Sequence, residues 1–278
     1  MTSIKSLTKI AAVVFAAVLA LCVTLLSGCS NDSKSEDKTI TIAAVPTPHA
    51  EILNEVVAPA LKDKGYTLEV KEFTDYVQPN TVTEEGEVDA NYFQHGPYLE
   101  DFNEQNDTHL VSVASVHYEP FGLYSTKYTD VAQIPDGATI AVPNDTTNEA
   151  RALLLLEQEG LIKLNPDAGV TATINDIVEN PKNLQIRELE AAVVPTVIDD
   201  VDAAAVNANY ALEGNLMDKQ IAVEDPNGLA AQTYANLIVV KEGNENLDKI
   251  KALVEVINSD EVRDYINQNY NGAVVPSF

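Results

Sequence analysis

The 278-residue sequence predicts an α/β protein in which two lobes face one cleft. Residues 39–45 form a β-rich run, apolar residues recur at helical spacing over 52–61, and residues 68–73 alternate between apolar and polar like a strand. A strand, a helix and a strand in this order are typical of a parallel βαβ unit. A second strand-like run at 138–142 begins a similar order of elements, which predicts a second unit.

The second unit has signals of its own. A turn follows residues 138–142, and Thr146 and Glu149 then fit a capping box, so a helix is expected to begin at Thr146. Residues 184–189 and 203–206 are expected to be later strands of this unit. The sequence therefore predicts a mixture of strands and helices in both halves of the chain.

A short sequence motif occurs in both predicted units. Val-Asp-Ala occurs at 88–90 and again at 201–203, and each copy is followed by Asn and Tyr residues. Two strand ends that carry polar and aromatic clusters would suit two lobes on opposite sides of one cleft. Chance recurrence of three residues explains the motif equally well.

The N-terminus has the features of a bacterial secretory signal. Two lysines precede an uncharged apolar stretch over residues 10–26, and Ser27, Gly28 and Cys29 follow it. Small residues directly before a cysteine are the pattern of a lipobox, in which the signal peptide is cleaved and the cysteine is acylated. We expect residues 1–28 to be this signal peptide, and an uncleaved transmembrane anchor is the alternative.

The segment after the cleavage point is predicted to be a tether. Residues 29–38 would comprise the lipidated Cys29 and a flexible linker, because 30–38 contain no apolar residue. The other cysteine, Cys22, lies within the apolar stretch and would be removed with the signal peptide. The mature domain is therefore expected to have no disulfide, and to be anchored by lipid at the extracytoplasmic face of the cell membrane.

Charge and motif content argue against several functions. The chain has 17 basic and 43 acidic residues, a formal net charge of −26, and such a surface repels nucleic acid. It contains no glycine-rich phosphate loop, no Gly-x-Ser-x-Gly elbow and no His-Glu-x-x-His motif, so no enzyme activity and no cofactor are expected. The histidines match no compact metal-binding motif, and we expect no metal site. These histidines are His49, His95, His109 and His117.

The densest cluster of candidate binding residues is 91–98, with the sequence NYFQHGPY. Its rings could hold an apolar ligand side chain while the histidine and the amides bind the polar end of the ligand. Residues 75–80, DYVQPN, have a similar character with fewer such groups. Packing in the core is the alternative interpretation for any single ring.

Arg151 is the candidate carboxylate-binding residue. It lies in the second turn of the helix expected from Thr146, where backbone amides and the helix dipole favour an anion, and arginine can bind a carboxylate bidentately. A surface ion pair with Glu149 or Glu157 is the alternative. Uncharged amides beside strand-like runs suit the charged groups of a zwitterion, or else cap the strand ends. These amides are Asn207, Asn209 and Asn236.

At these residues the chain resembles the NlpA family of methionine-binding lipoproteins, which serve methionine importers of the ABC type. The matching stretches occur in family order through nearly the whole mature chain. They are PTPHAEIL (46–53), DYVQPN (75–80), VDANYFQHGPYLEDFN (88–103), the histidine and proline of HYEPFGLYS (117–125), PNDTTNEARALLLL (143–156), ENPKNLQIRELEAA (179–192), DDVDAAAVNANYAL (199–212), YANLIVVKEGNE (234–245) and GAVVPSF (272–278).

The resemblance implies a type II periplasmic-binding-protein fold, with two α/β lobes joined by two crossovers and the ligand between them. Lobe 1 would comprise residues 39–118 and 235–278, and lobe 2 would comprise residues 119–234. Arg151 would bind the ligand carboxylate, and the aromatic residues would hold the thioether. The ligand-binding residues that the resemblance implies are Tyr76, Phe93, His95, Tyr98, Arg151, Asn207 and Asn236.

The implied function is the capture of methionine, with L-methionine as the first choice, by a monomer that docks on an ABC permease and its ATPase. Departures from the family pattern at Thr196 and at Gln232-Thr233 leave the exact ligand open. A methionine-containing dipeptide, D-methionine or another small amino acid are the alternatives. A surface adhesin-type lipoprotein is a more distant one.

Overall fold

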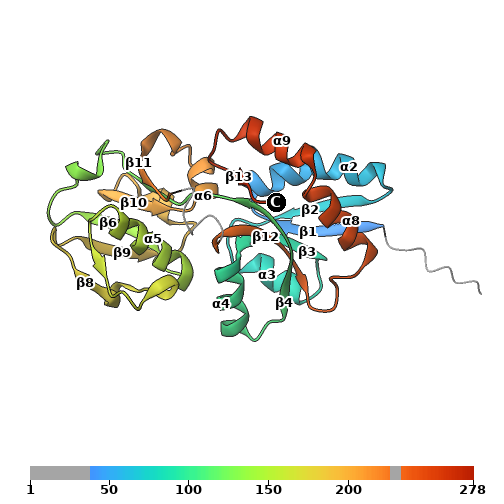
Figure 1. Cartoon of the computed structure of the whole chain (residues 1–278), viewed down its shortest axis with the longest axis horizontal. Coiled ribbons are helices and arrows are strands. Elements are labelled where there is room, and N and C mark those ends of the chain that lie inside the picture. The colour runs from blue at the N-terminus through green and yellow to red at the C-terminus, as the bar shows by residue number, and fades with distance from the viewer. Residues whose placement is uncertain (1–37, 226–232) are drawn as a thin grey trace, which may run out of the picture. The chain divides into compact units, whose positions relative to one another are not determined.

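Two β-sheets organise the part of the chain that the computed structural model describes, residues 38–225 and 233–278 (Figure 1). The predicted signal peptide and Cys29 lie outside these residues. Within them, no helix has both the length and the apolar character that crossing a bilayer requires.

The first sheet has six strands in the order β13-β4-β12-β3-β1-β2. β1 runs parallel to β2 and β3, as the sequence predicts for a βαβ unit, whereas β12 is antiparallel to β3 and β4. These strands are β1 (Thr39–Ala44), β2 (Thr67–Glu72), β3 (Ala90–His95), β4 (Leu110–Tyr118), β12 (Ala235–Lys241) and β13 (Val275–Pro276).

Helices cover the first sheet and complete its core. Ile40 and Ile42 of β1 are fully buried in one cluster with Leu253 of α8, and burying each such side chain contributes about 1.5–3 kcal/mol. The helix expected over 52–61 is present as η2 and α2, and Gly65, with a φ of 82°, follows its end. The helical segments are η1 (Pro46–Ala50), η2 (Leu53–Val57), α2 (Ala58–Asp63), α3 (Gln78–Glu84), α4 (Gly96–Asn106), α8 (Asp248–Ile257) and α9 (Asp260–Asn269).

The second sheet has five strands in the order β11-β5-β10-β6-β9. β6 is parallel to β9 and β10, whereas β5 is antiparallel to β10 and β11. Its strands are β5 (Gly122–Tyr124), β6 (Thr139–Pro143), β9 (Gln185–Leu189), β10 (Ala203–Val206) and β11 (Gln220–Val223). The other elements of this part are α5 (Thr146–Gln158), α6 (Ala208–Glu213), the short strands β7 (Lys163–Leu164) and β8 (Ile177–Glu179), and the helical turns η3 (Val131–Gln133), η4 (Gly169–Thr171), η5 (Ile174–Asp176), η6 (Val194–Val197) and η7 (Met217–Lys219).

The start of α5 corrects one expectation. The N-cap is Asp145, not Thr146, because the Asp145 backbone is extended and its carboxylate accepts a hydrogen bond from the backbone amide of Asn148 at 3.0 Å. Glu149 therefore does not complete a capping box. Its carboxylate accepts instead from the backbone amide of Ile174 at 2.9 Å, which ties α5 to η5.

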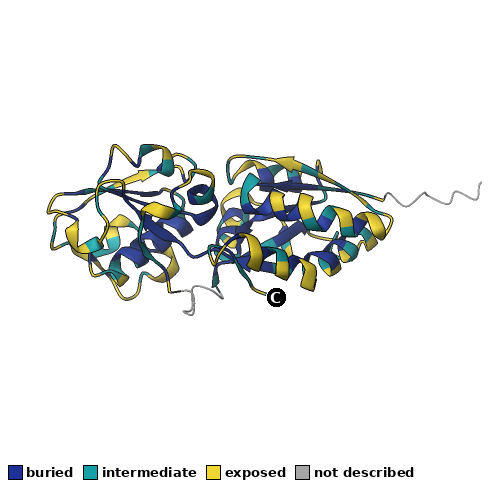
Figure 2. Cartoon of the chain, turned by 90° about the horizontal axis from the view of Figure 1, so that it is seen from above, coloured by how far each residue is buried: buried dark blue, intermediate teal, exposed yellow. Residues whose placement is uncertain are grey.

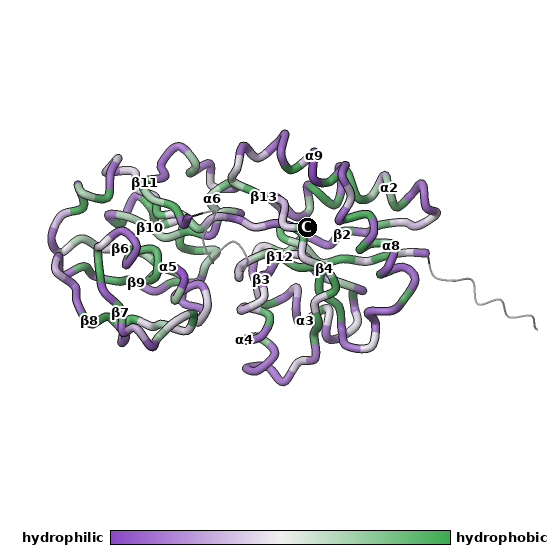
Figure 3. Tube along the Cα trace, in the orientation of Figure 1, coloured by the Kyte–Doolittle hydropathy of each residue, from purple (hydrophilic) through white to green (hydrophobic). Residues whose placement is uncertain are grey.

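The two sheets belong to two lobes. The chain leaves the first sheet between β4 and β5 and returns between β11 and β12. The lobe boundaries at 118/119 and 234/235 stay a prediction. Each sheet has its own buried hydrophobic cluster (Figure 2), and hydrophobic residues follow the central strands of both (Figure 3). Below, lobe 1 is the six-stranded sheet with its helices, and lobe 2 is the five-stranded sheet with its helices.

Candidate ligand-binding site

A small cavity lies where the two lobes meet. The space open to the centre of a water molecule is about 20 Å³, which is room for about one water. All seven residues that the sequence implied as ligand-binding line this cavity. The lining residues are Tyr76, Phe93, Gln94, His95, Tyr98, Glu119, Asn148, Arg151, Asn207, Ala208, Asn209 and Asn236.

The sheet register brings the lobe 1 side chains together. In β12, Asn236 pairs with His95 of β3 on one side and with His117 of β4 on the other. Glu119 follows directly after β4, at the start of the passage into lobe 2. Asn207 follows the end of β10 in lobe 2, so a strand end from each lobe meets at the cavity.

Aromatic rings form the apolar wall of the cavity. The Tyr76 ring lies 5.7 Å from that of Phe93 and 5.9 Å from that of Tyr98, measured between centroids. On the lobe 2 side it stacks on Tyr210 at 5.0 Å. The Tyr98 hydroxyl donates to the backbone oxygen of Tyr76 at 3.0 Å, which fixes the two rings relative to each other. The arrangement offers a ring-lined surface to an apolar side chain.

Arg151 is buried and has a specific acidic partner. Its Nε and Nη2 atoms donate to the two carboxylate oxygens of Glu224, each at 2.7 Å. Nη2 also donates to the backbone oxygen of Glu119 at 2.7 Å, and the guanidinium lies 4.4 Å from the ring centroid of Tyr234. Burial lowers the pKa of Arg151, but Glu224 more than offsets this and the net pKa is raised. The alternative of a surface pair with Glu149 or Glu157 is therefore wrong.

His95 is a neutral hydrogen-bonding group at this site. Its Nδ1 accepts from the backbone amide of Tyr98 at 3.2 Å, which leaves the proton on Nε2, 3.2 Å from the side-chain oxygen of Asn148. Burial, reinforced by the nearby charge of Arg151, lowers the pKa of His95 to about 3. The imidazole therefore donates a hydrogen bond at neutral pH without carrying a charge.

Two amide atoms at the cavity have no hydrogen-bond partner among the described residues. The side-chain nitrogen of Asn207 donates to Asn148 at 2.8 Å, but the Asn207 Oδ1 atom is buried and unpaired. The Asn209 Oδ1 atom accepts from the Tyr76 hydroxyl at 2.6 Å, but its Nδ2 atom is likewise unpaired. Buried polar groups are rarely left unpaired in proteins. One free acceptor and one free donor at a cavity suit a ligand that has both kinds of group.

Behind the cavity, His49, His117 and Glu119 bring three potential metal-ligating atoms within 4.8 Å of one another. His117 Nε2 lies 2.7 Å from a carboxylate oxygen of Glu119, while its Nδ1 is hydrogen-bonded to the hydroxyl of Tyr92. A hydroxyl that donates to Nδ1 places the imidazole proton on Nε2, where it is donated to Glu119. A hydrogen bond thus accounts for the short distance between His117 and Glu119 without a metal ion between them. The expectation that the protein has no metal site stays a prediction.

The same group contains three buried titratable residues. Burial lowers the pKa of His117 to about 3. It lowers the pKa of His49 to about 4, with partial opposition from Glu119. Burial raises the pKa of Glu119. His49 Nε2 lies 2.9 Å from the side-chain oxygen of Asn236, so this group also holds an amide that faces the cavity.

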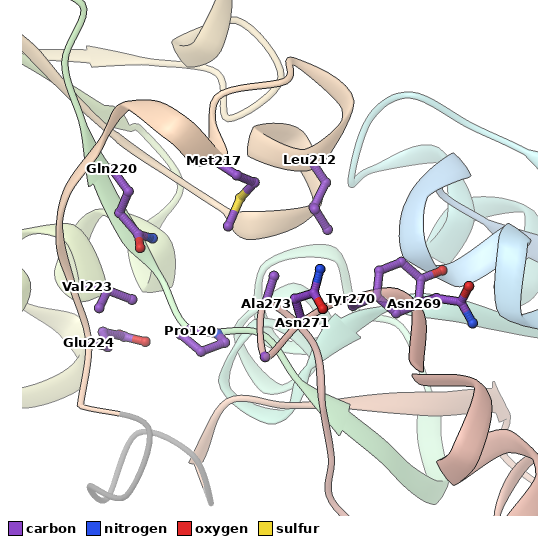
Figure 4. A pocket seen from close by; sticks show the side chains of 11 residues that line it. Pro120, Leu212, Met217, Gln220, Val223, Glu224, Asn269, Tyr270, Asn271 and Ala273 are labelled. Carbon is purple, nitrogen blue, oxygen red and sulfur yellow. The ribbon is translucent and has the colours of Figure 1, made fainter. Parts of the chain in front are cut away.

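A second and larger cavity, of about 460 Å³, is lined by α6, η7, β11 and the segment after α9 (Figure 4). The described residues that line it include none of those predicted from the sequence, and Glu224 is the one among them that carries a charge. Because Glu224 also binds Arg151, this side chain lies between the two cavities. The smaller cavity is lined by an arginine, a glutamate and several aromatic rings, and its lining includes all seven predicted ligand-binding residues, so we take it as the candidate ligand site.

Comparison with known proteins gives the family. Residues 40–278 match the family described as NlpA lipoprotein. The chain belongs to the NlpA lipoprotein family. It is 44% identical over 267 residues to the methionine-binding lipoprotein MetQ of Bacillus subtilis, with 95% of each chain covered. It is 38% identical over 264 residues to the membrane lipoprotein TpN32 of Treponema pallidum, with 94% of this chain and 97% of that one covered.

Solved structures of similar proteins confirm the two-lobed periplasmic-binding fold. A nutrient-binding protein of Burkholderia cenocepacia bound to methionine gives a TM-score of 0.82 at 43% identity, over 86% of this chain and 100% of that one. Lipoprotein Tp32 of Treponema pallidum gives 0.82 at 39% identity, over 87% and 100%. These relatives are named as binding proteins and lipoproteins, and not as enzymes.

Sequence reasoning missed part of the site in this NlpA chain. Glu119, Asn148 and Ala208 line the cavity but carry no local pattern that marks them. Conversely, Thr196 is exposed in η6, and neither it nor Thr233 lines the cavity. Gln232 lies outside the described residues. The departures from the family pattern that the structure describes are therefore outside the lining of the site.

Proposed function

We propose that the chain is a lipid-anchored substrate-binding protein that captures methionine, L-methionine in the first place, for an ABC importer. The observation that carries the proposal is the cavity itself, which is lined by a buried arginine from lobe 2 and by aromatic rings from lobe 1. It is supported by the relatives named for methionine and by the relative solved with methionine bound.

In this proposal Arg151 binds the ligand carboxylate. Glu224 occupies Nε and Nη2, which leaves Nη1 as the edge with no hydrogen-bond partner among the described residues. Phe93, Tyr76 and Tyr98 hold the thioether, where each sulfur–aromatic contact contributes about 0.3–1.5 kcal/mol. His95, Asn207 and Asn236 bind the polar end of the ligand, in a site that has no role in catalysis.

Capture requires the lobes, with boundaries at 118/119 and 234/235, to move relative to each other. The cavity is too small for an amino acid to enter as it stands, and hydrogen bonds such as Tyr210 hydroxyl to Thr74 backbone oxygen, 3.1 Å, join the lobes. We propose that the ligand shifts the population toward the closed form, and that this monomer then docks on the permease and its ATPase. Acylated Cys29 would hold the protein at the extracytoplasmic membrane face.

Calorimetric titration of the full chain in detergent micelles tests the function. L-methionine, D-methionine and Gly-Met are titrated into the wild type, Arg151→Ala and Arg151→Lys. We expect L-methionine to bind tightest and Arg151→Ala to weaken it by roughly 30-fold or more, since a charge-paired carboxylate loses its partner. Arg151→Lys keeps the charge and tests the site should Arg151→Ala not fold.

The matched control is Arg187→Ala, an exposed arginine of β9. It is expected to bind L-methionine like the wild type. Binding of none of the three ligands by the wild type would overturn the methionine assignment. Preference for D-methionine or Gly-Met would keep the binding function and change its ligand.

A further inference from the structure

The cavity has one negative and one positive side chain, which are complementary to the positive ammonium and the negative carboxylate of an α-amino acid. Among the twelve described residues that line it, one is acidic, Glu119, and one carries a fixed positive charge, Arg151. The two are neighbours, because Arg151 Nη2 donates to the Glu119 backbone oxygen at 2.7 Å. An α-amino acid carries its ammonium and carboxylate groups on a single carbon. A site that binds both groups by charge therefore needs an anionic and a cationic side chain close together.

The Glu119 carboxylate is buried without a direct ion pair to a charged cation, although the charge of Arg151 acts on it from nearby. The guanidinium of Arg151 is taken up by Glu224, so it does not form a direct pair with the side chain of Glu119. Among the described residues, the ion-pair contacts of Glu119 are to His117 at 2.7 Å and His49 at 3.6 Å, and burial keeps both histidines neutral. A buried carboxylate that lacks a counter-charge is costly. A ligand ammonium would supply the missing charge.

The protein holds this carboxylate in place from behind. Tyr92 and His117 are fully buried, and the hydrogen bond between them fixes the imidazole so that Nε2 donates to Glu119. On the cavity side, the buried and unpaired Oδ1 atom of Asn207 offers a second acceptor. An ammonium has three hydrogen-bond donors and no acceptor, and the Glu119 carboxylate and the Asn207 Oδ1 atom can both accept from it.

We propose that Glu119 binds the α-ammonium group of the ligand, with Tyr92 and His117 as its positioning residues. The inference rests on the proposed function and extends it, because it restricts the site to ligands with a free α-amino group beside the carboxylate. Arg151 then binds the carboxylate of the zwitterion and Glu119 binds its ammonium, while the aromatic rings contact the ligand side chain.

The test separates the ammonium from the rest of the ligand. The full chain in detergent micelles is titrated with L-methionine and with its deaminated analogue, which keeps the thioether and the carboxylate. The wild type should prefer L-methionine by roughly 30-fold or more, and Glu119→Gln should lose this factor for L-methionine alone. Glutamine keeps an oxygen that can accept from His117, so the fold is expected to persist. Glu149→Gln, a buried glutamate outside the cavity, is the matched control and should bind like the wild type.

Each outcome decides the proposal. Equal affinity of the wild type for L-methionine and the analogue overturns it without any variant. Unchanged L-methionine binding by Glu119→Gln, or equal losses for both ligands, overturns it as well, while the methionine function stands. Failure of the wild type to bind L-methionine removes the proposed function and this inference together.

Discussion

Arg151 and Glu224 form a buried bidentate ion pair, in which Nε to Oε1 and Nη2 to Oε2 are both 2.7 Å. Glu224 also accepts from the Tyr118 hydroxyl at 2.8 Å and from the backbone amide of Phe121 at 3.0 Å. Glu224 thus holds the guanidinium in one orientation, and is itself held by the end of β4 and by the passage that follows this strand. Fixing an arginine in this way removes rotamer freedom that a ligand would otherwise have to restrain.

The first prediction concerns the stability that this pair provides. Glu224→Gln leaves the Arg151 charge buried without its counter-charge, so the free energy of unfolding should fall by about 3 kcal/mol. Denaturant unfolding of the ligand-free protein measures it. Glu179→Gln breaks the exposed pair with Lys163, and its effect should stay within about 0.5 kcal/mol. Equal effects of the two changes would contradict a special role for the buried pair.

The second prediction concerns how the site distinguishes sulfur. Phe93→Leu keeps the cavity apolar but removes the aromatic face, so L-methionine affinity should fall by roughly 2–10-fold. L-norleucine has a methylene in place of sulfur, and its affinity should change less. Calorimetric titration of both ligands measures the difference. Phe102→Leu, a buried ring of the same cluster that does not line the cavity, is the control. Parallel losses for both ligands would show that the ring acts by shape alone.

The fold and one part of the site follow from local sequence. The βαβ unit at 39–73 and the cluster at 91–98 are each contiguous, so periodicity and residue type are enough to find them. Arg151 was found because a helix begins shortly before it. The exact cap was missed by one residue, since Asp145 and Thr146 are both good capping residues and only the backbone angles decide between them.

The rest depends on contacts between residues far apart in the chain. His117 is only two residues from Glu119 in the chain, whereas His49 lies in η1 and reaches the same carboxylate, at 3.6 Å, through tertiary packing alone. The spacing of histidines in the sequence therefore gave no sign of their grouping. Glu224 and Arg151 are likewise 73 residues apart, so no local pattern could name the partner of the arginine.

The third prediction is a loss of stability in mild acid. Burial, with a further contribution from Arg151, lowers the pKa of His95 in the folded protein to about 3, against 6.5 for an ordinary histidine. Between these values the unfolded chain binds more protons, so the free energy of unfolding falls as pH is lowered, by up to about 1.4 kcal/mol per pH unit. His117 and His49 act in the same direction, whereas Glu119, whose pKa burial raises, acts in the opposite one.

Denaturant unfolding at several pH values between about 5 and 7 measures this dependence. His95→Gln should reduce the slope by up to about 1.4 kcal/mol per pH unit, because one buried imidazole no longer has to stay neutral. His109→Gln, which replaces an exposed histidine away from the cavity, is the control for the loss of a histidine as such. An identical slope in His95→Gln and the wild type would show that this imidazole does not control the acid sensitivity.

The fourth prediction concerns the lipid anchor. If Cys29 is the acylated residue, metabolic labelling with palmitate should mark the wild type and Cys22→Ser but not Cys29→Ser. Cys22 is a matched control, because it lies within the apolar stretch that would be removed with the signal peptide. Acyl chains hold a protein at a membrane through about 0.8 kcal/mol for each buried methylene group, so an unlabelled protein also lacks that source of membrane affinity. Label that persists in Cys29→Ser would place the acylation elsewhere, and a wild type without label would favour the uncleaved anchor.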